Sequence, residues 1–242
     1  MLPTKPKIML PTKPKTKSKN KYLSILPVST SKKETRENYD RISKFYDYTE
    51  GIFEKKYIDV ALNCLDLKQG EVVLEIGFGT GNALIKIADQ VGQSGMVNGI
   101  DISPKMLDLA FKKVKNKSLS DRIKLTCGDA AKLPYSNNIF DAVFLSFTLE
   151  LFDTPEIPEI LKEVKRVLKP GGRLGIVSLS KDNEKSLFLR LYEWAHIKFP
   201  KYIDCRPIFA AHLIKKAGFY ISFLKKAKIF LAPIEIVIGI KN

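Results

Sequence analysis

Short apolar runs alternate with helix-like segments along most of the chain. The first run, residues 72–76, is rich in Val, Leu and Ile, which is typical of a strand buried on both faces of a parallel sheet. Later runs predict strands at 96–101, 122–127, 140–147 and 173–179. Apolar residues at helical spacing predict helices between them, at 82–91, 104–114 and 157–168. Because parallel strands are joined by crossovers, this order predicts an α/β fold with a doubly wound sheet.

Two regions flank these elements. Ahead of the first strand, aromatic and apolar residues between Tyr39 and Tyr57 recur at helical spacing and predict one or two amphipathic helices. After the fifth strand, the sequence predicts helices at 187–199 and 207–217 and strands at 219–230 and 234–240, joined around Pro233. The apolar face of 187–199 is wider than a simple surface helix needs, which suggests a lid over a site.

The first 33 residues differ from the rest in composition. They hold nine Lys and no acid, and the segment MLPTKPK occurs at 1–7 and again at 9–15. Their Pro and Lys content predicts a basic, disordered tail at 1–33, followed by one domain at 34–242. Without this tail the net charge of +15 falls to +6, which weakens the case for a nucleic-acid groove.

Composition also bounds the location of the protein. No apolar stretch reaches the roughly 18 residues of a membrane span, and the three cysteines have no metal-site or disulfide spacing. We therefore expect a reduced, cytoplasmic protein without a metal site, and the basic tail leaves peripheral contact with an anionic membrane open. The sequence leaves the oligomeric state open.

The motif Gly77-x-Gly79-x-Gly81 follows the first predicted strand and marks the candidate ligand site. Glycines allow a sharp turn and a close approach of a ligand, and the next helix begins with free amide donors. Such turns occur in several nucleotide-binding folds, so the glycines alone do not identify the ligand.

Three carboxylates around this turn narrow the choice. Asp101 ends the second strand, about twenty residues after the turn, where a carboxylate can accept both ribose hydroxyls. Asp129 follows the third strand, where it can accept an adenine amino group. Glu75 precedes the turn and would repel a pyrophosphate but attract an ammonium or sulfonium. The set favours S-adenosylmethionine over NAD, which stays the alternative.

Several segments closely resemble the class I S-adenosylmethionine-dependent methyltransferases. They are VLEIGFGTGNAL (73–84), GIDISPKMLDLA (99–110), CGDAAKLPY (127–135), FDAVFLSFTLELF (140–152) and LKEVKRVLKPGGRL (161–174). With YDRISKFYD (39–47) they are most similar to the branch of ubiquinone and menaquinone C-methyltransferases and some phospholipid N-methyltransferases. The resemblance implies a Rossmann-like, seven-stranded sheet whose last strand is antiparallel, with N-terminal helices and a lid helix.

The resemblance also implies roles for individual residues. The glycines wrap the methionine portion of the cofactor, Asp101 holds the ribose, and Tyr46 closes over the cofactor from the N-terminal helix. The implied cofactor-binding set is Tyr46, Glu75, Gly77, Gly79, Gly81, Asp101, Ile102, Asp129, Ala130 and Ser146. No general base is evident, and in-line transfer of a methyl group needs one only for some acceptors.

The acceptor is predicted from the aromatic residues of the N-terminal helices and of 187–199. They indicate an apolar or amphipathic molecule, either a quinone-like ring or a lipid head group, near Phe147, Trp194 and Arg206. Arg206 could pair an acidic group of the acceptor, or serve a structural contact with Asp204. Ser146-Phe147-Thr148-Leu149-Glu150 differs from the Arg-Asn-type sequence of the quinone methylases, which leaves quinone and lipid open.

A macromolecular acceptor is the alternative. The basic tail could dock RNA or protein for methylation, as salt-sensitive binding would reveal. The chain has neither an Asn-Pro-Pro-Tyr type motif nor the Pro-Cys loop of cytosine-C5 enzymes, and both absences count against nucleic acid.

Overall fold

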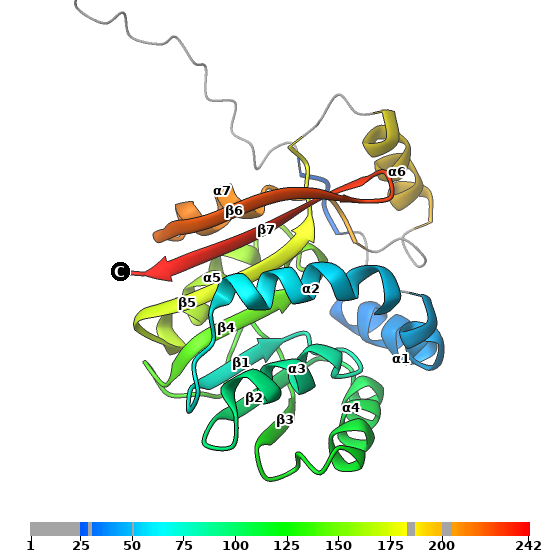
Figure 1. The fold of residues 1–242 in the computed structure, drawn as a ribbon. Coiled ribbons are helices and arrows are strands. Elements are labelled where there is room, and N and C mark those ends of the chain that lie inside the picture. Colours follow the sequence, from blue (N-terminus) through cyan, green and yellow to red (C-terminus); the bar gives the residue numbers. More distant parts are fainter. Residues whose placement is uncertain (1–24, 29–30, 50, 183–186, 200–204) are drawn as a thin grey trace, which may run out of the picture.

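A seven-stranded sheet with helices on both faces forms the centre of the computed structural model (Figure 1). The structure describes residues 25–28, 31–49, 51–182, 187–199 and 205–242, and it describes no side chain within 42–53. The strands are β1 (Val72–Ile76), β2 (Met96–Asp101), β3 (Ile123–Cys127), β4 (Phe140–Ser146), β5 (Leu168–Leu179), β6 (Phe219–Ile229) and β7 (Ala232–Lys241).

The strand order is β3-β2-β1-β4-β5-β7-β6. Strands β1 to β5 pair in parallel, whereas β7 is antiparallel to both of its neighbours. The predicted doubly wound sheet with an antiparallel last strand is therefore confirmed. The order reverses between β1 and β4, and the carboxyl ends of strands at such a switch point form a natural ligand crevice.

Helices cover the two faces because each presents an apolar stripe to the sheet. One face packs against α5 (Ile157–Val167) and α7 (Ala210–Lys216). The other packs against α2 (Gly51–Leu65), α3 (Asn82–Val91) and α4 (Pro104–Asn116). The predicted N-terminal helices correspond to α1 (Lys32–Thr49) and α2, and the predicted lid helix to α6 (Leu187–Lys198). None of the described helices is long and apolar enough to cross a membrane.

The bounds of three C-terminal elements differ from the predictions. Helix α7 begins at Ala210, and β5 already pairs with β4 at Leu168, ahead of a register shift. The last hairpin turns at Phe230 and Leu231, so Pro233 lies within β7, opposite Lys228. The prediction of a turn around Pro233 is therefore displaced by two to three residues. A strand end near a hairpin tip tolerates proline, although proline lacks a backbone donor.

The predicted disorder of residues 25–33 is wrong where the structure describes them. Ile25 is buried in the hydrophobic core, and the Val28 amide donates to Asp153 Oδ1 at 3.1 Å. Helix α1 begins at Lys32, after a capping box in which Ser31 and Glu34 exchange hydrogen bonds. Residues 1–24, which hold most of the predicted tail, lie outside the described residues.

Candidate functional site

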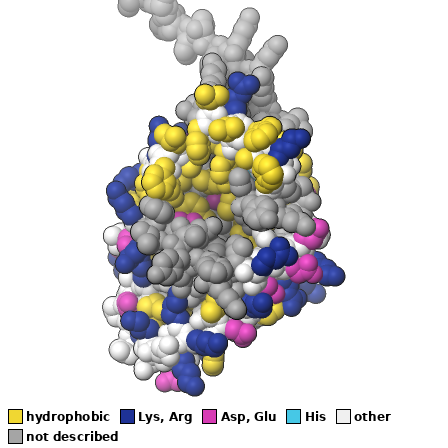
Figure 2. All heavy atoms as spheres, turned by 90° about the vertical axis from the view of Figure 1, so that its right-hand side faces the viewer, with side chains coloured by type: hydrophobic (Ala, Val, Ile, Leu, Met, Phe, Trp, Pro, Cys, Tyr) yellow, Lys and Arg dark blue, Asp and Glu magenta, His cyan; other side chains and the backbone are white. Residues whose placement is uncertain are grey.

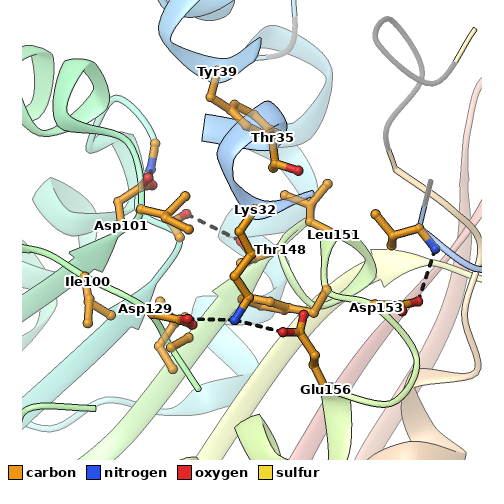
Figure 3. A pocket seen from close by; sticks show the side chains of 18 of the residues that line it. Lys32, Thr35, Tyr39, Ile100, Asp101, Asp129, Thr148, Leu151, Asp153 and Glu156 are labelled. Atoms are coloured by element: carbon orange, nitrogen blue, oxygen red, sulfur yellow. Dashed lines mark hydrogen bonds and ion pairs between the residues drawn. The ribbon is translucent and has the colours of Figure 1, made fainter. Parts of the chain in front are cut away.

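A cavity of about 360 Å³ lies at the carboxyl ends of β1, β2 and β4, beneath α1 (Figure 3). This volume is within the range of small-molecule sites, about 300–1,000 Å³. Eight of the residues predicted from the sequence line it, and they are Gly77, Gly79, Asp101, Ile102, Asp129, Ala130, Ser146 and Phe147. The sheet edge thus brings together residues that are about 70 positions apart.

The turn after β1 is held in a tight conformation. Gly77 has a φ of +71°, and its amide donates to the carbonyl of Ile100 at 2.8 Å. A Cβ atom added to Gly77 would lie 2.4 Å from Thr148 Cγ2, so only glycine fits between the β1 and β4 loops. Gly81 serves the start of α3 and packs against Ala110; it is not among the residues that line the cavity.

Asp101 is bound to the same turn. Its Oδ2 accepts from the Gly79 amide and its Oδ1 from the Ser103 amide, both at 2.9 Å. Burial raises the pKa of Asp101 to about 6, although these backbone hydrogen bonds act in the opposite direction. The side chain of Asp101 is therefore fixed in position, and a ligand group that donates hydrogen bonds to it would favour its ionised form.

Two buried polar atoms near the turn lack a hydrogen-bond partner among the described residues. They are Glu75 Oε2 and Ser146 Oγ, at the ends of β1 and β4. Burial, and the nearby charge of Asp101, raise the pKa of Glu75 well above its ordinary value. Burying an ionised carboxyl costs free energy unless a cation or a hydrogen-bond donor pairs with it. The two atoms, Glu75 Oε2 and Ser146 Oγ, therefore indicate a site for a polar ligand.

A second cavity of about 650 Å³ lies on the other side of the glycine turn. Glu75 lines it, and it shares Gly77, Gly79 and Ser146 with the first cavity. The two cavities therefore meet at the turn and can together hold an extended ligand.

Residues ahead of β1 complete the first cavity, and the sequence analysis missed them. Lys32 Nζ lies 2.6 Å from Asp129 Oδ2 and 2.8 Å from Glu156 Oε1, and Thr35 and Tyr39 of α1 line the same wall (Figure 3). The apolar residues 25–28 and the capping box at 31–34 were the signals that could have revealed this ordered segment.

The Lys32 contact also sets the charge of Asp129. Burial would raise the pKa of Asp129, but the hydrogen bonds from Lys32 and from the Ala131 amide outweigh it and hold this pKa below its ordinary value. Asp129 is thus a carboxylate at neutral pH.

Phe147 is strained where it meets the cavity. Its φ is +49°, a left-handed conformation that is uncommon for a bulky side chain, and its amide donates to Val177 at 2.8 Å. Such strain is often retained at binding sites, which agrees with the predicted place of Phe147.

The structure places two predicted residues, Trp194 and Arg206, away from the cavities. Trp194 is 52% exposed on α6 and, like Arg206, is not among the residues that line either cavity. Arg206 is fully buried and donates to the carbonyl of Phe152 and to Thr154 Oγ1, so it holds a loop that borders the site. Burial lowers the pKa of Arg206 to about 10, while Asp153 and Glu150 act to raise it. The side chain of Tyr46 lies outside those described.

The charge of the first cavity contrasts with that of the chain. The net charge is +15, yet among the described residues four acids and one cation, Lys32, line the cavity, and the acids are Asp101, Asp129, Asp153 and Glu156. Clustered carboxylates with low-dielectric walls attract cations and repel phosphates. The lining of the first cavity therefore favours a positively charged group over a phosphate.

Comparisons with known proteins agree with this site. The model of the ubiE/COQ5 methyltransferase family matches residues 27–220. The chain is 38% identical over 156 residues to the demethylmenaquinone methyltransferase of Lactobacillus johnsonii, which covers 61% of this chain and 62% of that relative. It is 31% identical over 198 residues to the enzyme of that name from Symbiobacterium thermophilum, covering 75% and 78%.

A solved structure shows the same fold. It is a SAM-dependent methyltransferase from Aquifex aeolicus, with a TM-score of 0.60 and 22% identity, covering 76% of this chain and 89% of that one. The first two curated relatives align with the chain over about three fifths of their own length, 62% and 59%.

Proposed function

Because the chain belongs to the ubiE/COQ5 methyltransferase family, we propose that it transfers a methyl group from S-adenosylmethionine to a quinone-like ring. The names of the relatives support this acceptor class over a lipid head group. The observation that carries the proposal is the set of acids around the glycine turn: four line the first cavity, and buried Glu75, whose Oε2 has no hydrogen-bond partner among the described residues, lines the second. A cationic nucleoside satisfies these carboxylates, whereas the four acids of the first cavity disfavour a pyrophosphate there.

The residues present fit this cofactor. In the proposal, Asp101 accepts the ribose hydroxyls, and Ile102 packs on the adenine. Asp129 and Ala130 meet the edge of the adenine. Glu75, in the second cavity, binds the ammonium of the methionine portion and becomes ionised as it does so, because the ammonium offsets the cost of its burial.

When bound, S-adenosylmethionine supplies an electrophilic methyl group on a positively charged sulfur. The chain itself aligns the acceptor and excludes water, which is worth several kcal/mol in a reaction of this kind. Ser146, which ends β4, lines both cavities, and Phe147 after it lines the first, so we assign the two residues to the place where the reacting methyl group meets the acceptor. Arg206 and Trp194 then act outside the reacting centre.

We also propose that the protein works in the cytoplasm and meets its apolar acceptor at a membrane surface. The alternative, an RNA or protein acceptor that docks through residues 1–33, gains no support from the described part of that segment. Ile25 packs into the core, the Val28 amide is bound to Asp153, and Lys32 is paired with Asp129 and Glu156.

Calorimetry with S-adenosylhomocysteine tests the cofactor site. Replacing Asp101→Ala should weaken binding about 100-fold, because two charge-assisted hydrogen bonds of about 1.5 kcal/mol each are lost. The matched control is Asp121→Ala, an exposed aspartate outside both cavities, which should leave the affinity unchanged. Methylation of a short-chain demethylated naphthoquinol by the full chain tests the acceptor. Tight NAD binding, or unchanged affinity in Asp101→Ala, would refute the assignment.

A further inference from the structure

Helix α6 turns an apolar face away from the protein. Leu187, Leu191 and Trp194 follow one another at spacings of four and three residues and are 79%, 60% and 52% exposed. Leu189 and His196 on the opposite side of α6 are buried. The helix is therefore packed through its narrower side, and its larger apolar stripe has no place in the core.

The tip of the β6–β7 hairpin extends this surface. Phe230 and Leu231 form the turn and are 74% and 65% exposed. Figure 1 shows α6 beside this tip, and Tyr192 of α6 packs against the same core cluster as Ile229 and Ala232 of the hairpin. We call the combined surface the end patch, made up of Leu187, Leu191, Trp194, Ile197, Phe230 and Leu231.

Figure 2 shows hydrophobic side chains gathered around a hollow on this face, with Lys and Arg at its rim. Monomeric proteins seldom expose a contiguous apolar surface of this kind unless it binds something. We therefore expect the end patch to bind another molecule or a surface.

Most of the exposed charges described around the end patch are positive, and Asp182, an acid in this region, pairs with Lys226 of β6. Arg190 and Lys198 of α6 are exposed, and so are Lys225 and Lys228 of β6. The sequence from 219 to 233 contains no acid, and the only acid in the sequence of α6, Glu193, pairs with Lys181. An apolar surface with a cationic rim is complementary to a layer with an apolar interior and anionic head groups.

We propose that the end patch docks on a membrane that contains anionic phospholipids. Trp194 and the leucines enter the boundary between head groups and acyl chains, where Trp is favoured, and the Lys and Arg side chains contact the phosphates. A second copy of the chain is a poor occupant, because two identical positive rims repel one another. The inference rests on the proposed function in one respect: docking on a membrane serves an enzyme whose apolar acceptor lies in that membrane.

Vesicle binding by the full chain tests the proposal directly. Trp194 is the one tryptophan of the sequence, so its fluorescence reports on the end patch alone. With vesicles of phosphatidylcholine and about 30% phosphatidylglycerol, the emission should shift to the blue and the protein should co-sediment. Leu191→Glu/Leu231→Glu should reduce partitioning about tenfold or more, because two exposed apolar contacts become charged like the lipid.

Phe111→Glu is the matched control. Phe111 is 53% exposed on α4, outside the end patch, and its replacement should leave partitioning within about twofold. All variants keep residues 1–24, so binding through that segment would persist in Leu191→Glu/Leu231→Glu and would overturn the proposal. Equal binding to pure phosphatidylcholine vesicles, or a dimer that this double variant dissolves, would overturn it too.

Turnover separates this proposal from the proposed function. Leu191→Glu/Leu231→Glu should methylate a water-soluble, short-chain quinol at the unchanged rate and lose activity only on acceptor held in vesicles. Methylation in vesicles that survives the loss of binding would overturn the claim that docking serves turnover. If the parent binds vesicles as expected but neither the parent nor the variant methylates any quinol, the acceptor assignment fails and the docking surface stands.

Discussion

Replacing Gly77→Ala should damage both the stability of the protein and its cofactor site. The backbone of Gly77 has a φ of +71°, and an added Cβ would lie 2.4 Å from Thr148 Cγ2 and 2.5 Å from Thr148 Oγ1. Thr148 cannot easily turn away, because it is 5% exposed and its hydroxyl donates to the carbonyl of Ser146 at 2.8 Å. The β1 and β4 loops must therefore separate.

The loss of stability in Gly77→Ala has two additive causes. A left-handed φ costs a residue with a Cβ about 1–2 kcal/mol relative to glycine. Overpacking in a filled interior costs a further 1–3 kcal/mol or so. We therefore expect Gly77→Ala to lower the free energy of unfolding by about 2–5 kcal/mol, which a domain of ordinary stability survives. Movement of the turn also displaces the Gly79 amide that holds Asp101, so cofactor affinity should fall.

Gly171 provides a matched control. Its φ is +74°, but nothing lies within 4 Å of an added Cβ. Gly171→Ala should therefore show the backbone cost alone, about 1–2 kcal/mol, and unchanged cofactor affinity. Urea unfolding and calorimetry with S-adenosylhomocysteine measure the two quantities.

Thr148→Ala should partly rescue Gly77→Ala, because it removes the two closest atoms. The double-mutant cycle should show a favourable coupling of about 1 kcal/mol or more. If Gly77→Ala and Gly171→Ala are equally destabilised, or if the cycle shows no coupling, the steric argument is refuted.

Acidification should weaken cofactor binding below about pH 6, because burial raises the pKa of Asp101 to about 6 and only its ionised form accepts both ribose hydroxyls. Calorimetry should show affinity falling about tenfold per pH unit there, and a flat profile would contradict this. Since this folded-state pKa lies above the unfolded value, Asp101 makes the free protein less stable as pH rises from about 4 to about 6. Separately, Arg206→Met should cost about 3–5 kcal/mol in urea unfolding, since buried partners lose their cation, while exposed Arg190→Met should stay within about 0.5 kcal/mol. Similar losses in both would show that Arg206 is not structural.

The sheet and the glycine turn could be predicted because their signals are local. An apolar run followed by closely spaced glycines specifies a strand and a sharp turn from a few adjacent residues. The cavity-lining positions of Asp101 and Asp129 then followed, since parallel strands end at the same edge of a sheet.

The places of Arg206 and Trp194 could not be predicted from such signals. Arg206 is buried by segments that meet only in the folded chain, and its partners Phe152 and Thr154 lie more than fifty positions away. For Trp194, helical spacing shows an apolar face but does not tell whether it points inward or outward. The cavity-lining position of Lys32 could not be predicted for a different reason: its neighbours in the sequence have the Lys-rich composition of a disordered tail.

These findings connect the N-terminal segment to the chemistry of the cavity. Arg206 holds the 152–154 loop, and Asp153 of this loop accepts from the Val28 amide. Lys32, further along the same segment, is paired with Asp129 (Figure 3). The segment therefore contacts two carboxylates, Asp129 and Asp153, that also line the ligand cavity. An exposed ion pair contributes only about 0–1 kcal/mol, so Lys32 alone cannot hold the segment closed. Burial of Ile25 and the packing of α1 on α4 add to the attachment, so the carboxylate of Asp129 can turn to a ligand at little cost.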